Sequence, residues 1–351
     1  MAKEKQMKKR GIFRLAAAAA ALCLLAACGT GKGGDGSAFA PAQQERLVIY
    51  TSHKEEVWWP IVREFEERTG IWVDVVTGGT NELLERIRLE ADSPAADVMF
   101  GGGVESLESY NEYFTPYLCR DAGQIASRYR TESNLWTPFS ALPVVLIYNP
   151  KLVAPGQLSG WTDLLRPEFR GRIAFADPAV SASCYTGLVT MLCALDAPQE
   201  ETLRRFAENL DGRLLAGSGD ILSSVADGTD CVGITLEETA LRRIAAGENL
   251  RMVYPAEGTS AVPDGSALLR GAKHEENAKR FLDFTVSRDV QALIQEEEFS
   301  RRSVRGDIEP SASLPQLDKL SMVDYDAAWA SRERGNILKS WQSFLPQEET
   351  S

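Results

Sequence analysis

The sequence predicts an α/β protein in which two α/β lobes with mainly parallel sheets meet at a hinge and enclose a central cleft. Two observations lead to this prediction. Apolar strands alternate with amphipathic helices from Leu47 onward, which is the rhythm of parallel strands joined by right-handed crossovers. A second alternating region follows a long apolar strand at 142–148, and extended segments join the two regions. Small molecules bind outside the carboxyl ends of such strands, so we expect a ligand in the cleft.

The hydrophobic pattern sets the expected elements. Val57, Ile61 and Phe65 share one helical face, and Gly70 ends that helix. The expected strands are 47–50, 71–76, 97–100, 142–148, 172–176, 231–235 and 250–254. Among the later helices we expect 187–195, 221–226, 239–246, 275–286, 290–296 and a helical tail at 321–344. We expect residues 47–138 plus 264–311 to form lobe 1, and 139–263 plus 312–351 to form lobe 2.

The first 27 residues carry the pattern of a secretory signal. A basic start is followed by an apolar run at 15–27 that is too short for a stable membrane span. Leu25-Ala26-Ala27-Cys28 resembles the bacterial lipoprotein processing box, which implies diacylation of Cys28 and cleavage before it. A flexible linker then extends over 28–46. We therefore expect a protein held by its lipid at a membrane, in the periplasm or on the outer face of the cell membrane.

The charge of the chain argues against a nucleic-acid partner. Loss of residues 1–27 changes the formal net charge from −12 to −17, because six basic residues and one acidic residue leave. A nucleic-acid-binding protein would carry a basic surface instead. A local site can still oppose the overall field, so the charge does not decide the ligand.

The remaining cysteines predict no metal site. Cys119, Cys184, Cys193 and Cys231 form neither a CxxC pair nor a Cys/His pattern. We interpret them mainly as small buried apolar residues, since a chain of this length can bury a core without covalent links. An oxidising compartment also permits a disulfide, and spacing alone cannot give the pairing.

Small residues gather where predicted strands lead into helices. The four junctions are Gly78-Gly79-Thr80, Gly101-Gly102-Gly103, Ser181-Ala182-Ser183 and Ser218-Gly219. A helix N-terminus leaves N–H groups unpaired and carries the positive end of the helix dipole, which suits an anion. Every helix also needs a cap, and the same residue types serve there. From this pattern we select Thr80, Gly102, Ser181 and Ser183 as candidate ligand contacts.

Four other residues are candidates for the ligand site. Ser52 and His53 follow the first strand at its carboxyl end, and Tyr185 could stack on a ligand or pack in the core. Glu238, or Glu237 beside it, could accept hydrogen bonds from hydroxyls or an amine, or could cap the next helix. The basic residues Arg301, Arg302 and Arg305 are expected on the surface, as a docking feature for a partner, rather than at a phosphate.

The order and spacing of these segments resemble the solute-binding proteins of bacterial ABC importers, in the branch with ferric-ion, thiamine, phosphonate and sugar-phosphate binders. The motifs are Leu47–Thr51, Ser52-His53-Lys54-Glu55, 65–71, 95–98, 232–235, 254–259, 277–281, 300–305 and 324–329. The resemblance implies the type II periplasmic-binding-protein fold, two lobes that close on a small molecule and then dock on a permease and its ATPase. It further implies a monomer with no resident cofactor or metal.

The ligand is the open question at this level. Ferric-ion members hold iron with an adjacent tyrosine pair, and the matching position here reads Leu236-Glu237-Glu238-Thr239. We therefore expect a small anionic solute, such as a phosphonate, an organophosphate or a sugar phosphate. A cation, meaning ferric ion, thiamine or a polyamine, is the alternative that the negative charge supports.

The sequence offers little support for an enzyme. The chain has two histidines, His53 and His274, and neither a GxSxG elbow nor an HExxH helix occurs. His274 stands at a polar helix start, which is no catalytic context. A protein with the same fold could instead serve as a sensor that feeds a membrane receptor, which is an alternative to a role in import.

Overall fold

The computed structural model describes residues 42–296 and 299–346. The predicted signal at 1–27, the lipidated Cys28 and most of the linker lie outside the described residues. The first described element is a short 3-10 turn at Gln43–Glu45, and the first strand follows at once. None of the helices in the described ranges combines the length and the apolar character that crossing a membrane requires.

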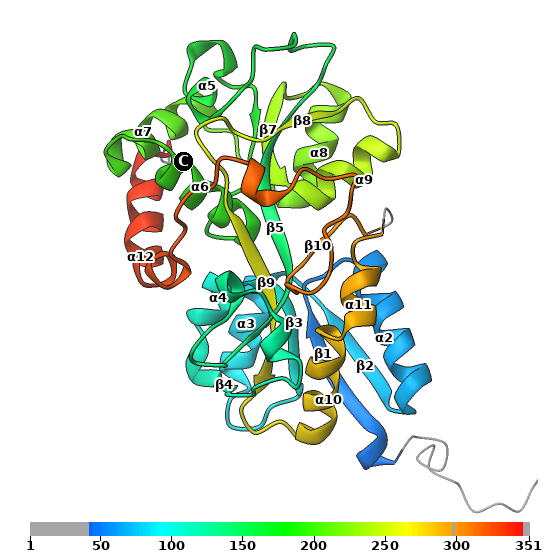
Figure 1. Ribbon diagram of the computed structural model, residues 1–351. Coiled ribbons are helices and arrows are strands. Elements are labelled where there is room, and N and C mark those ends of the chain that lie inside the picture. Colours follow the sequence, from blue (N-terminus) through cyan, green and yellow to red (C-terminus); the bar gives the residue numbers. More distant parts are fainter. Residues whose placement is uncertain (1–41, 297–298, 347–351) are drawn as a thin grey trace, which may run out of the picture. The chain divides into compact units, whose positions relative to one another are not determined.

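Long strands run through the centre of the molecule and link its two ends (Figure 1). The strands are β1 (Arg46–Thr51), β2 (Trp72–Thr77), β3 (Val98–Gly103), β4 (Phe114–Thr115), β5 (Thr137–Tyr148), β6 (Ile173–Ala174), β7 (Val232–Leu236), β8 (Arg251–Val253), β9 (Ala261–Leu269) and β10 (Arg302–Ser303). Within the described residues they form one sheet in the order β2-β1-β3-β9-β5-β7-β6, with β4, β8 and β10 paired at its sides.

The helices cover the faces of this sheet (Figure 1). They are α2 (Glu55–Thr69), α3 (Thr80–Leu89), α4 (Val104–Glu108), α5 (Trp161–Leu164), α6 (Ala182–Ala194), α7 (Gln199–Leu210), α8 (Ser218–Asp227), α9 (Glu237–Ala245), α10 (Glu275–Thr285), α11 (Arg288–Leu293) and α12 (Ala327–Phe344). Gly70 ends α2 in the left-handed conformation, as the sequence predicts. Short 3-10 turns fill the connections at Asn111–Tyr113, Ala122–Gln124, Ser127–Tyr129, Pro167–Phe169 and Leu317–Lys319.

The α/β class is confirmed, and the direction of the strands differs between the ends and the centre of the sheet. β1 pairs in parallel with β2 and β3, and β6 pairs in parallel with β7. β5 and β9 instead run antiparallel to their neighbours. The expectation of mainly parallel sheets therefore holds for the outer strands, whereas the two connecting strands depart from it.

The strand β5 is shared by two groups of strands. Its residues 137–143 pair with β9, and its residues 144–148 pair with β7. The hydrophobic pattern predicts the second half of β5 but not β9, whose Pro263-Asp264-Gly265 has the composition of a turn. Pairing on both sides holds that segment extended, with Asp264 opposite both Ser140 and Gly103. Tertiary contacts therefore outweigh local preference there.

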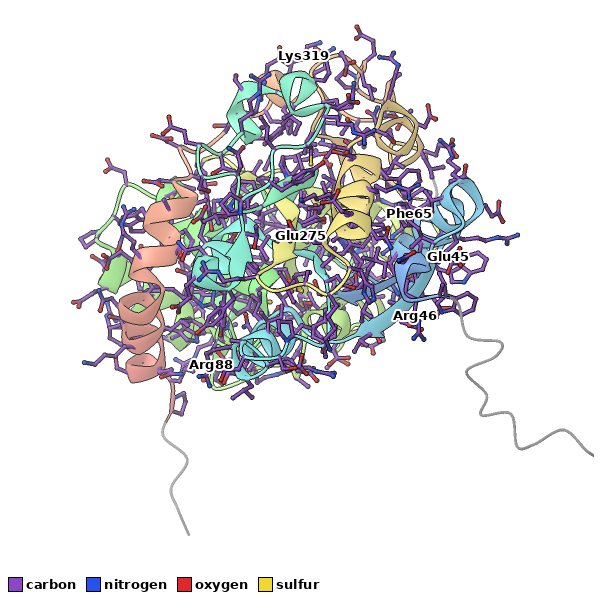
Figure 2. The ribbon with its side chains drawn as sticks, turned by 90° about the horizontal axis from the view of Figure 1, so that it is seen from below. Glu45, Arg46, Phe65, Arg88, Glu275 and Lys319 are labelled. Atoms are coloured by element: carbon purple, nitrogen blue, oxygen red, sulfur yellow. The ribbon has the colours of Figure 1, made fainter. Side chains whose placement is uncertain are left out.

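The apolar core divides at the same place. The first core lies on both faces of β2-β1-β3, with Leu47, Phe65, Leu84, Phe100 and Leu282 among its members. The second core surrounds β7, with Leu146, Trp161, Leu188, Phe206 and Trp341 among its members. On the first core, Phe65 of α2 lies 5.2 Å from Phe281 of α10 between ring centroids, so these helices pack side by side (Figure 2).

Candidate functional site

A cavity of about 340 Å³ opens between the two cores, at the carboxyl ends of β1, β2, β3 and β7. We call its two sides the first wall and the second wall. The first wall consists of Ser52, His53, Lys54, Gly79, Thr80, Gly102, Gly103, Asp264 and Arg301. The second wall consists of Val180, Ser181, Ala182, Ser183, Thr186, Gly217, Ser218, Gly219, Thr235, Leu236, Glu238 and Thr239. Leu142, Val262 and Pro263 lie between them.

The cavity brings together seven of the eight residues that the sequence suggested for ligand contact. Ser52, His53, Thr80 and Gly102 lie on the first wall. Ser181, Ser183 and Glu238 lie on the second wall. All four glycine- and serine-rich junctions contribute to the lining. The first two lie at the ends of β2 and β3, whereas Ser218-Gly219 follows α7 rather than a strand and begins α8, which corrects the sequence-based expectation for that junction.

Tyr185 is not at the cavity, which corrects the sequence-based expectation. Its side chain is fully buried in the second core, and its hydroxyl donates to the carbonyl oxygen of Ala330 on α12 at 2.5 Å. The guanidinium of Arg334 covers its ring at 4.3 Å from the centroid. Helical phase explains the placement, since Tyr185 shares its face of α6 with Leu188 and Leu192.

Glycines at the end of β3 let the first wall form. Gly101 and Gly102 have φ angles of +107° and +97°, a range that other residues rarely adopt. A Cβ on Gly101 would lie 2.9 Å from the Ser52 hydroxyl oxygen, and one on Gly102 would lie 2.8 Å from Cγ2 of Thr80. The close approach of β3 therefore places Ser52, His53 and Thr80 together at one end of the cavity.

His53 is a neutral imidazole at the floor of the cavity. Its ring packs edge-on against Phe100 at 4.5 Å and tilted against Phe139 at 5.3 Å, between centroids. Burial and the positive charge of Arg301 hold the pKa of His53 well below its usual range. Nε2 is buried, makes no hydrogen bond within the described protein and lies 3.7 Å from Oδ2 of Asp264.

Arg301 lies buried at the cavity rather than on the surface, so the sequence-based prediction for this residue is wrong. Its Nη1 donates to Oδ2 of Asp264 at 2.6 Å and to the hydroxyl of Ser140 at 2.8 Å. Its Nη2 approaches Oε1 of Glu238 on the second wall at 3.5 Å. Its Nε is buried and makes no hydrogen bond in the described structure. The guanidinium thus holds Asp264 and presents one unused donor.

Glu238 is the second residue of α9 and reaches the cavity from the second wall. Oε1 accepts from the hydroxyl of Thr239 at 2.8 Å. Oε2 lies 3.3 Å from Nε of Arg242 in an ion pair but is buried and accepts no hydrogen bond within the described residues. Arg242 in turn donates to Glu56 of α2 at 2.7 Å. A series of alternating charges therefore links the first core to α9 and then returns to α2. It consists of Asp264, Arg301, Glu238, Arg242 and Glu56.

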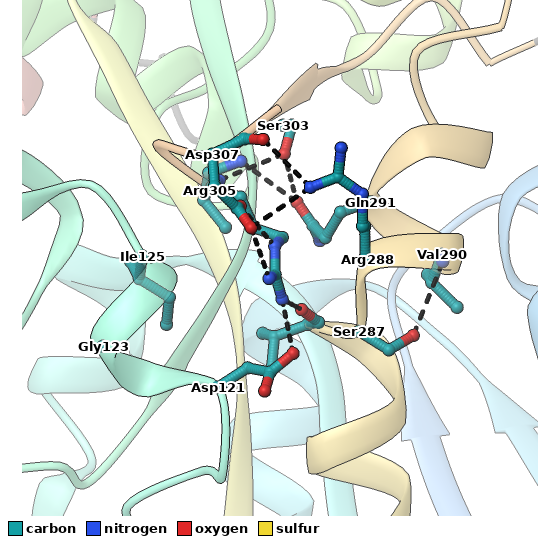
Figure 3. Close-up of polar contacts among 12 residues, drawn as sticks. Asp121, Gly123, Ile125, Ser287, Arg288, Val290, Gln291, Ser303, Arg305 and Asp307 are labelled. Carbon is teal, nitrogen blue, oxygen red and sulfur yellow. Dashed lines mark hydrogen bonds and ion pairs between the residues drawn. The ribbon is translucent and has the colours of Figure 1, made fainter. Parts of the chain in front are cut away.

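The two neighbouring arginines are structural. Arg302 donates from Nε and Nη2 to both oxygens of Glu237, at 2.7 and 2.8 Å, and all of these groups are buried. Arg305 donates to Asp121 at 2.6 Å, to Asp307 and to the carbonyl oxygen of Val286 (Figure 3). The expected surface cluster of basic residues is therefore absent at these positions, because each guanidinium is buried against its own acid.

The serines at the start of α6 differ in what they do. Ser181 caps the helix, since its Oγ accepts from the N–H of Cys184 at 3.3 Å. Ser183 lies in the first turn, and its hydroxyl forms a hydrogen bond with the Ser181 hydroxyl at 3.2 Å. Across the cavity mouth, the side-chain amide of Asn81 on α3 donates to the carbonyl oxygens of Ala179 and Val180, at 3.0 and 3.1 Å.

The described residues hold no group of three or more His, Cys, Asp or Glu side chains that could ligate a metal ion. The strand β7 leads into Glu237 and Glu238, and no tyrosine lines the described cavity. The four cysteines in the described ranges are free thiols, so the disulfide alternative has no support there.

A cavity at strand ends between two cores, lined by helix N-termini, is the arrangement of a solute-binding protein. The chain belongs to the bacterial extracellular solute-binding protein family, which it matches over residues 93–328. It is a solute-binding protein of the ABC-importer type that works outside the cytoplasm, and its family consists of binding proteins rather than enzymes.

The relatives and solved structures that this chain resembles are named for different ligands. Iron uptake protein A1 of Synechocystis sp. is 27% identical over 339 residues, which cover 89% of this chain and 93% of the relative. A periplasmic protein of Salmonella paratyphi A named for 2-aminoethylphosphonate binding is 27% identical over 322 residues, covering 87% and 89%. The periplasmic binding protein AfuA of Actinobacillus pleuropneumoniae, solved with fructose-6-phosphate, superposes with a TM-score of 0.79 at 24% identity, covering 86% of this chain and 98% of AfuA.

Proposed function

We propose that the cavity binds a small organic anion of the phosphonate or phosphate-ester class, and that a phosphorylated sugar fits it best. One observation carries the proposal: the N-termini of α3, α6 and α8 converge on one cavity whose side-chain charges balance. Arg301 and Lys54 offset Asp264 and Glu238, and His53 is neutral. The helix dipoles and unpaired N–H groups then set the sign of the field, and they favour an anion.

Three buried atoms that lack hydrogen bonds suit the sugar part of such a ligand. Nε of Arg301 is a donor, Oε2 of Glu238 is an acceptor, and Nε2 of His53 is either one according to its tautomer. A hydroxyl group donates and accepts at once, so vicinal hydroxyls can satisfy this mixed set. Leaving a buried polar group unpaired costs about 1–3 kcal/mol, which gives these atoms their capacity to discriminate.

A cationic ligand (ferric ion, thiamine or a polyamine) is the alternative. The relative named for iron uptake and the formal net charge of −12 favour it. The electrostatics of the cavity argue against it, because Arg301 already occupies the space between Asp264 and Glu238 at 2.6 and 3.5 Å. A metal ion would have to displace that guanidinium to reach either carboxylate.

A thermal-shift panel of phosphate esters, phosphonates, ferric citrate, thiamine and polyamines tests this function. A ligand at about 100 times its dissociation constant stabilises the bound form by about 2.7 kcal/mol. We expect fructose 6-phosphate or another phosphate ester to raise the melting temperature. A rise with ferric citrate, thiamine or polyamines alone would overturn the proposal in favour of the cationic alternative.

We also propose that the two cores move as lobes, with residues 47–138 plus 264–311 in one and 139–263 plus 312–351 in the other. The partition of the apolar clusters on either side of residue 144 supports a division near these bounds, although Phe139, Ala141 and Val262 pack in the first core. The Asn81 contacts across the cavity mouth would then break on opening. Small-angle scattering checks the motion, since the radius of gyration should fall on addition of a ligand found in the panel.

We propose that the mature protein is a monomer tethered through diacylated Cys28, with the preceding residues removed. The processing motif Leu25-Ala26-Ala27-Cys28 supports the tether. Mass spectrometry of the membrane-extracted protein should show an acylated N-terminal cysteine. A Cys28→Ser variant should lose the acyl chains and leave the membrane fraction, and an unmodified Cys28 in the native protein would contradict the anchor.

A further inference from the structure

A buried carboxyl group lies directly behind the cavity and is not one of its lining residues. Glu105 stands in the first turn of α4, two residues after Gly103, and its side chain is fully buried. Its Oε1 is hydrogen-bonded to Oγ1 of Thr186, which lines the cavity from α6. α4 packs in the first core through Val104 and Leu107, whereas α6 belongs to the second core. Glu105 therefore joins the two cores behind the ligand.

The hydrogen bonds around Thr186 indicate which atom carries the proton. Oγ1 of Thr186 contacts two acceptors, Oε1 of Glu105 and the carbonyl oxygen of Ala182 at 3.1 Å. A hydroxyl has one proton, and the backbone carbonyl can only accept. Both bonds form together when Thr186 donates to Ala182 and a protonated Glu105 donates to Thr186. A carboxylate would leave one of these bonds without a proton.

The second oxygen of Glu105 supports the same protonation state. Oε2 is buried and makes no hydrogen bond of good geometry within the described structure; the phenol of Tyr325 faces this carboxyl, and its own hydroxyl is likewise buried without such a bond. An ionised oxygen without a donor is costly in such a place, whereas the neutral acid tolerates it better. Burial also raises the pKa of Glu105 above its ordinary value.

Charged and titratable groups face Glu105 from the elements packed around it. Tyr325, ahead of α12, directs its buried phenol toward this carboxyl, and burial raises the pKa of Tyr325 well above its usual value. On α12, Arg334 lies over the ring of Tyr185 and opposes the upward shift of the Glu105 pKa, and Glu333 bonds to Asn336 at 2.7 Å.

The remaining neighbours of α4 are already paired. On β9, Asp264 is bonded to Arg301 and Ser140. On α3, Glu85 and Arg88 form an exposed pair with each other. Glu105 is therefore a fully buried acid that has no cationic hydrogen-bond partner in the described structure, unlike Asp264.

We propose that Glu105 is a proton-binding site that fastens the first core to the second behind the cavity, so that the closed, ligand-holding arrangement takes up one proton. The proton forms the Glu105–Thr186 bond that ties α4 to α6. When the two cores separate, the carboxyl meets water and releases the proton. Ligand capture by this chain is thereby linked to pH, through a group that does not touch the ligand.

The sign of the effect follows from linkage. The carboxyl binds its proton more tightly in the folded, closed state than in the open or unfolded state. Its stabilising contribution is complete below the ordinary glutamate pKa of about 4.3 and is lost as the pH rises through the higher, closed-state value. Between these two pKa values, the folding equilibrium constant falls by up to roughly tenfold for each pH unit. The comparison is with a chain in which residue 105 does not titrate.

Two measurements on the full chain test the proton site without any ligand. Infrared difference spectra should show a buried protonated carboxyl band that disappears in Glu105→Gln and persists in Glu132→Gln, a change at an exposed glutamate. The unfolding free energy of the native chain should fall relative to Glu105→Gln as the pH rises above the ordinary glutamate pKa of about 4.3. A native chain without that band, or a stability difference independent of pH, would overturn the proposal.

A third measurement tests the link to binding, with fructose 6-phosphate as the probe. Its affinity for the native chain should weaken as the pH rises, beyond what the ionisation of the ligand itself produces in Glu105→Gln. Equal pH profiles for the two proteins would contradict the coupling. If neither protein binds the probe, the proposed ligand class fails, while the infrared and stability measurements still decide the protonation of Glu105.

Discussion

The two walls of the cavity carry different kinds of polar group. The first wall supplies buried charge, with Arg301 and Asp264 fixed to each other at 2.6 Å beside the neutral His53. The second wall supplies hydroxyls, glycines and the N-termini of α6 and α8, with Glu238 as its acid. The first wall therefore combines fixed side-chain charge with the N-terminus of α3, whereas the second wall offers mainly hydroxyls and main-chain N–H groups that suit an anion.

This difference separates residues that build the cavity from residues that read the ligand. Arg301 and Asp264 support each other, so removing either damages the fold as well as the site. Glu238 and Ser183 can be changed with less structural damage because they begin helices at the cavity edge. Changes on the first wall should mainly lower stability, and changes on the second wall should mainly lower affinity.

The largest expected effect is on the first wall. Arg301→Met should lower the free energy of unfolding by about 3–5 kcal/mol, because Asp264 would stay buried without its cation. Urea denaturation measures the loss. Arg63→Met is the matched control, since Arg63 pairs with Glu67 on the exposed face of α2 and should change stability by less than about 1 kcal/mol. If the two variants lose the same free energy of unfolding, the buried Arg301–Asp264 pair contributes no more to stability than an exposed pair.

The second effect is on the second wall. Glu238→Gln should weaken binding of fructose 6-phosphate by roughly 10- to 100-fold, since a hydrogen bond to a charged group contributes about 1.5–3 kcal/mol. Isothermal titration calorimetry measures the affinity. Glu201→Gln, at an exposed position on α7, serves as the control and should bind like the native chain. Native affinity in Glu238→Gln would remove Glu238 from the ligand site.

The two serines of α6 sharpen the comparison further. Ser183→Ala should reduce affinity by about threefold to tenfold and leave stability nearly unchanged. Ser181→Ala should lower the unfolding free energy by about 1 kcal/mol, because it removes the N-cap of α6. Paired titration and denaturation of both variants check the assignment. A loss of affinity only in Ser181→Ala would reverse the two roles.

The smallest effect is expected away from the cavity. Tyr185→Phe should lower stability by about 1 kcal/mol through loss of its hydrogen bond to Ala330, and binding should stay at the native level. Calorimetry with the same ligand checks this. A clear loss of affinity would mean that Tyr185 reaches the ligand after all.

Local sequence signals predicted the strand-to-helix junctions because those signals depend on neighbouring residues. Thr80, Gly102 and Ser183 stand directly where predicted strands lead into helices, and they meet at one cavity. Tyr185 was selected by residue type, although its spacing from Leu188 and Leu192 already indicated the apolar face. Residue chemistry alone therefore misplaced a side chain that helical phase places correctly.

Partners that lie far apart along the chain could not be predicted. Arg301 and Asp264 are 37 positions apart, and Asp264 lies in a segment with the composition of a turn. Arg302 and Glu237 are 65 positions apart. A run of basic residues in an acidic chain predicts an exposed cluster. Only the folded structure brings the acidic partners that let these arginines be buried. Glu105 gave no signal in the sequence for the same reason.

Calorimetric titration with fructose 6-phosphate and with fructose tests the central claim most directly. If helix N-termini hold an anion in this cavity, the phosphorylated sugar should bind and the free sugar should bind at least about 100-fold more weakly. Equal binding of the two sugars would contradict the anion site. Binding of ferric citrate without either sugar would assign the cavity to a cation.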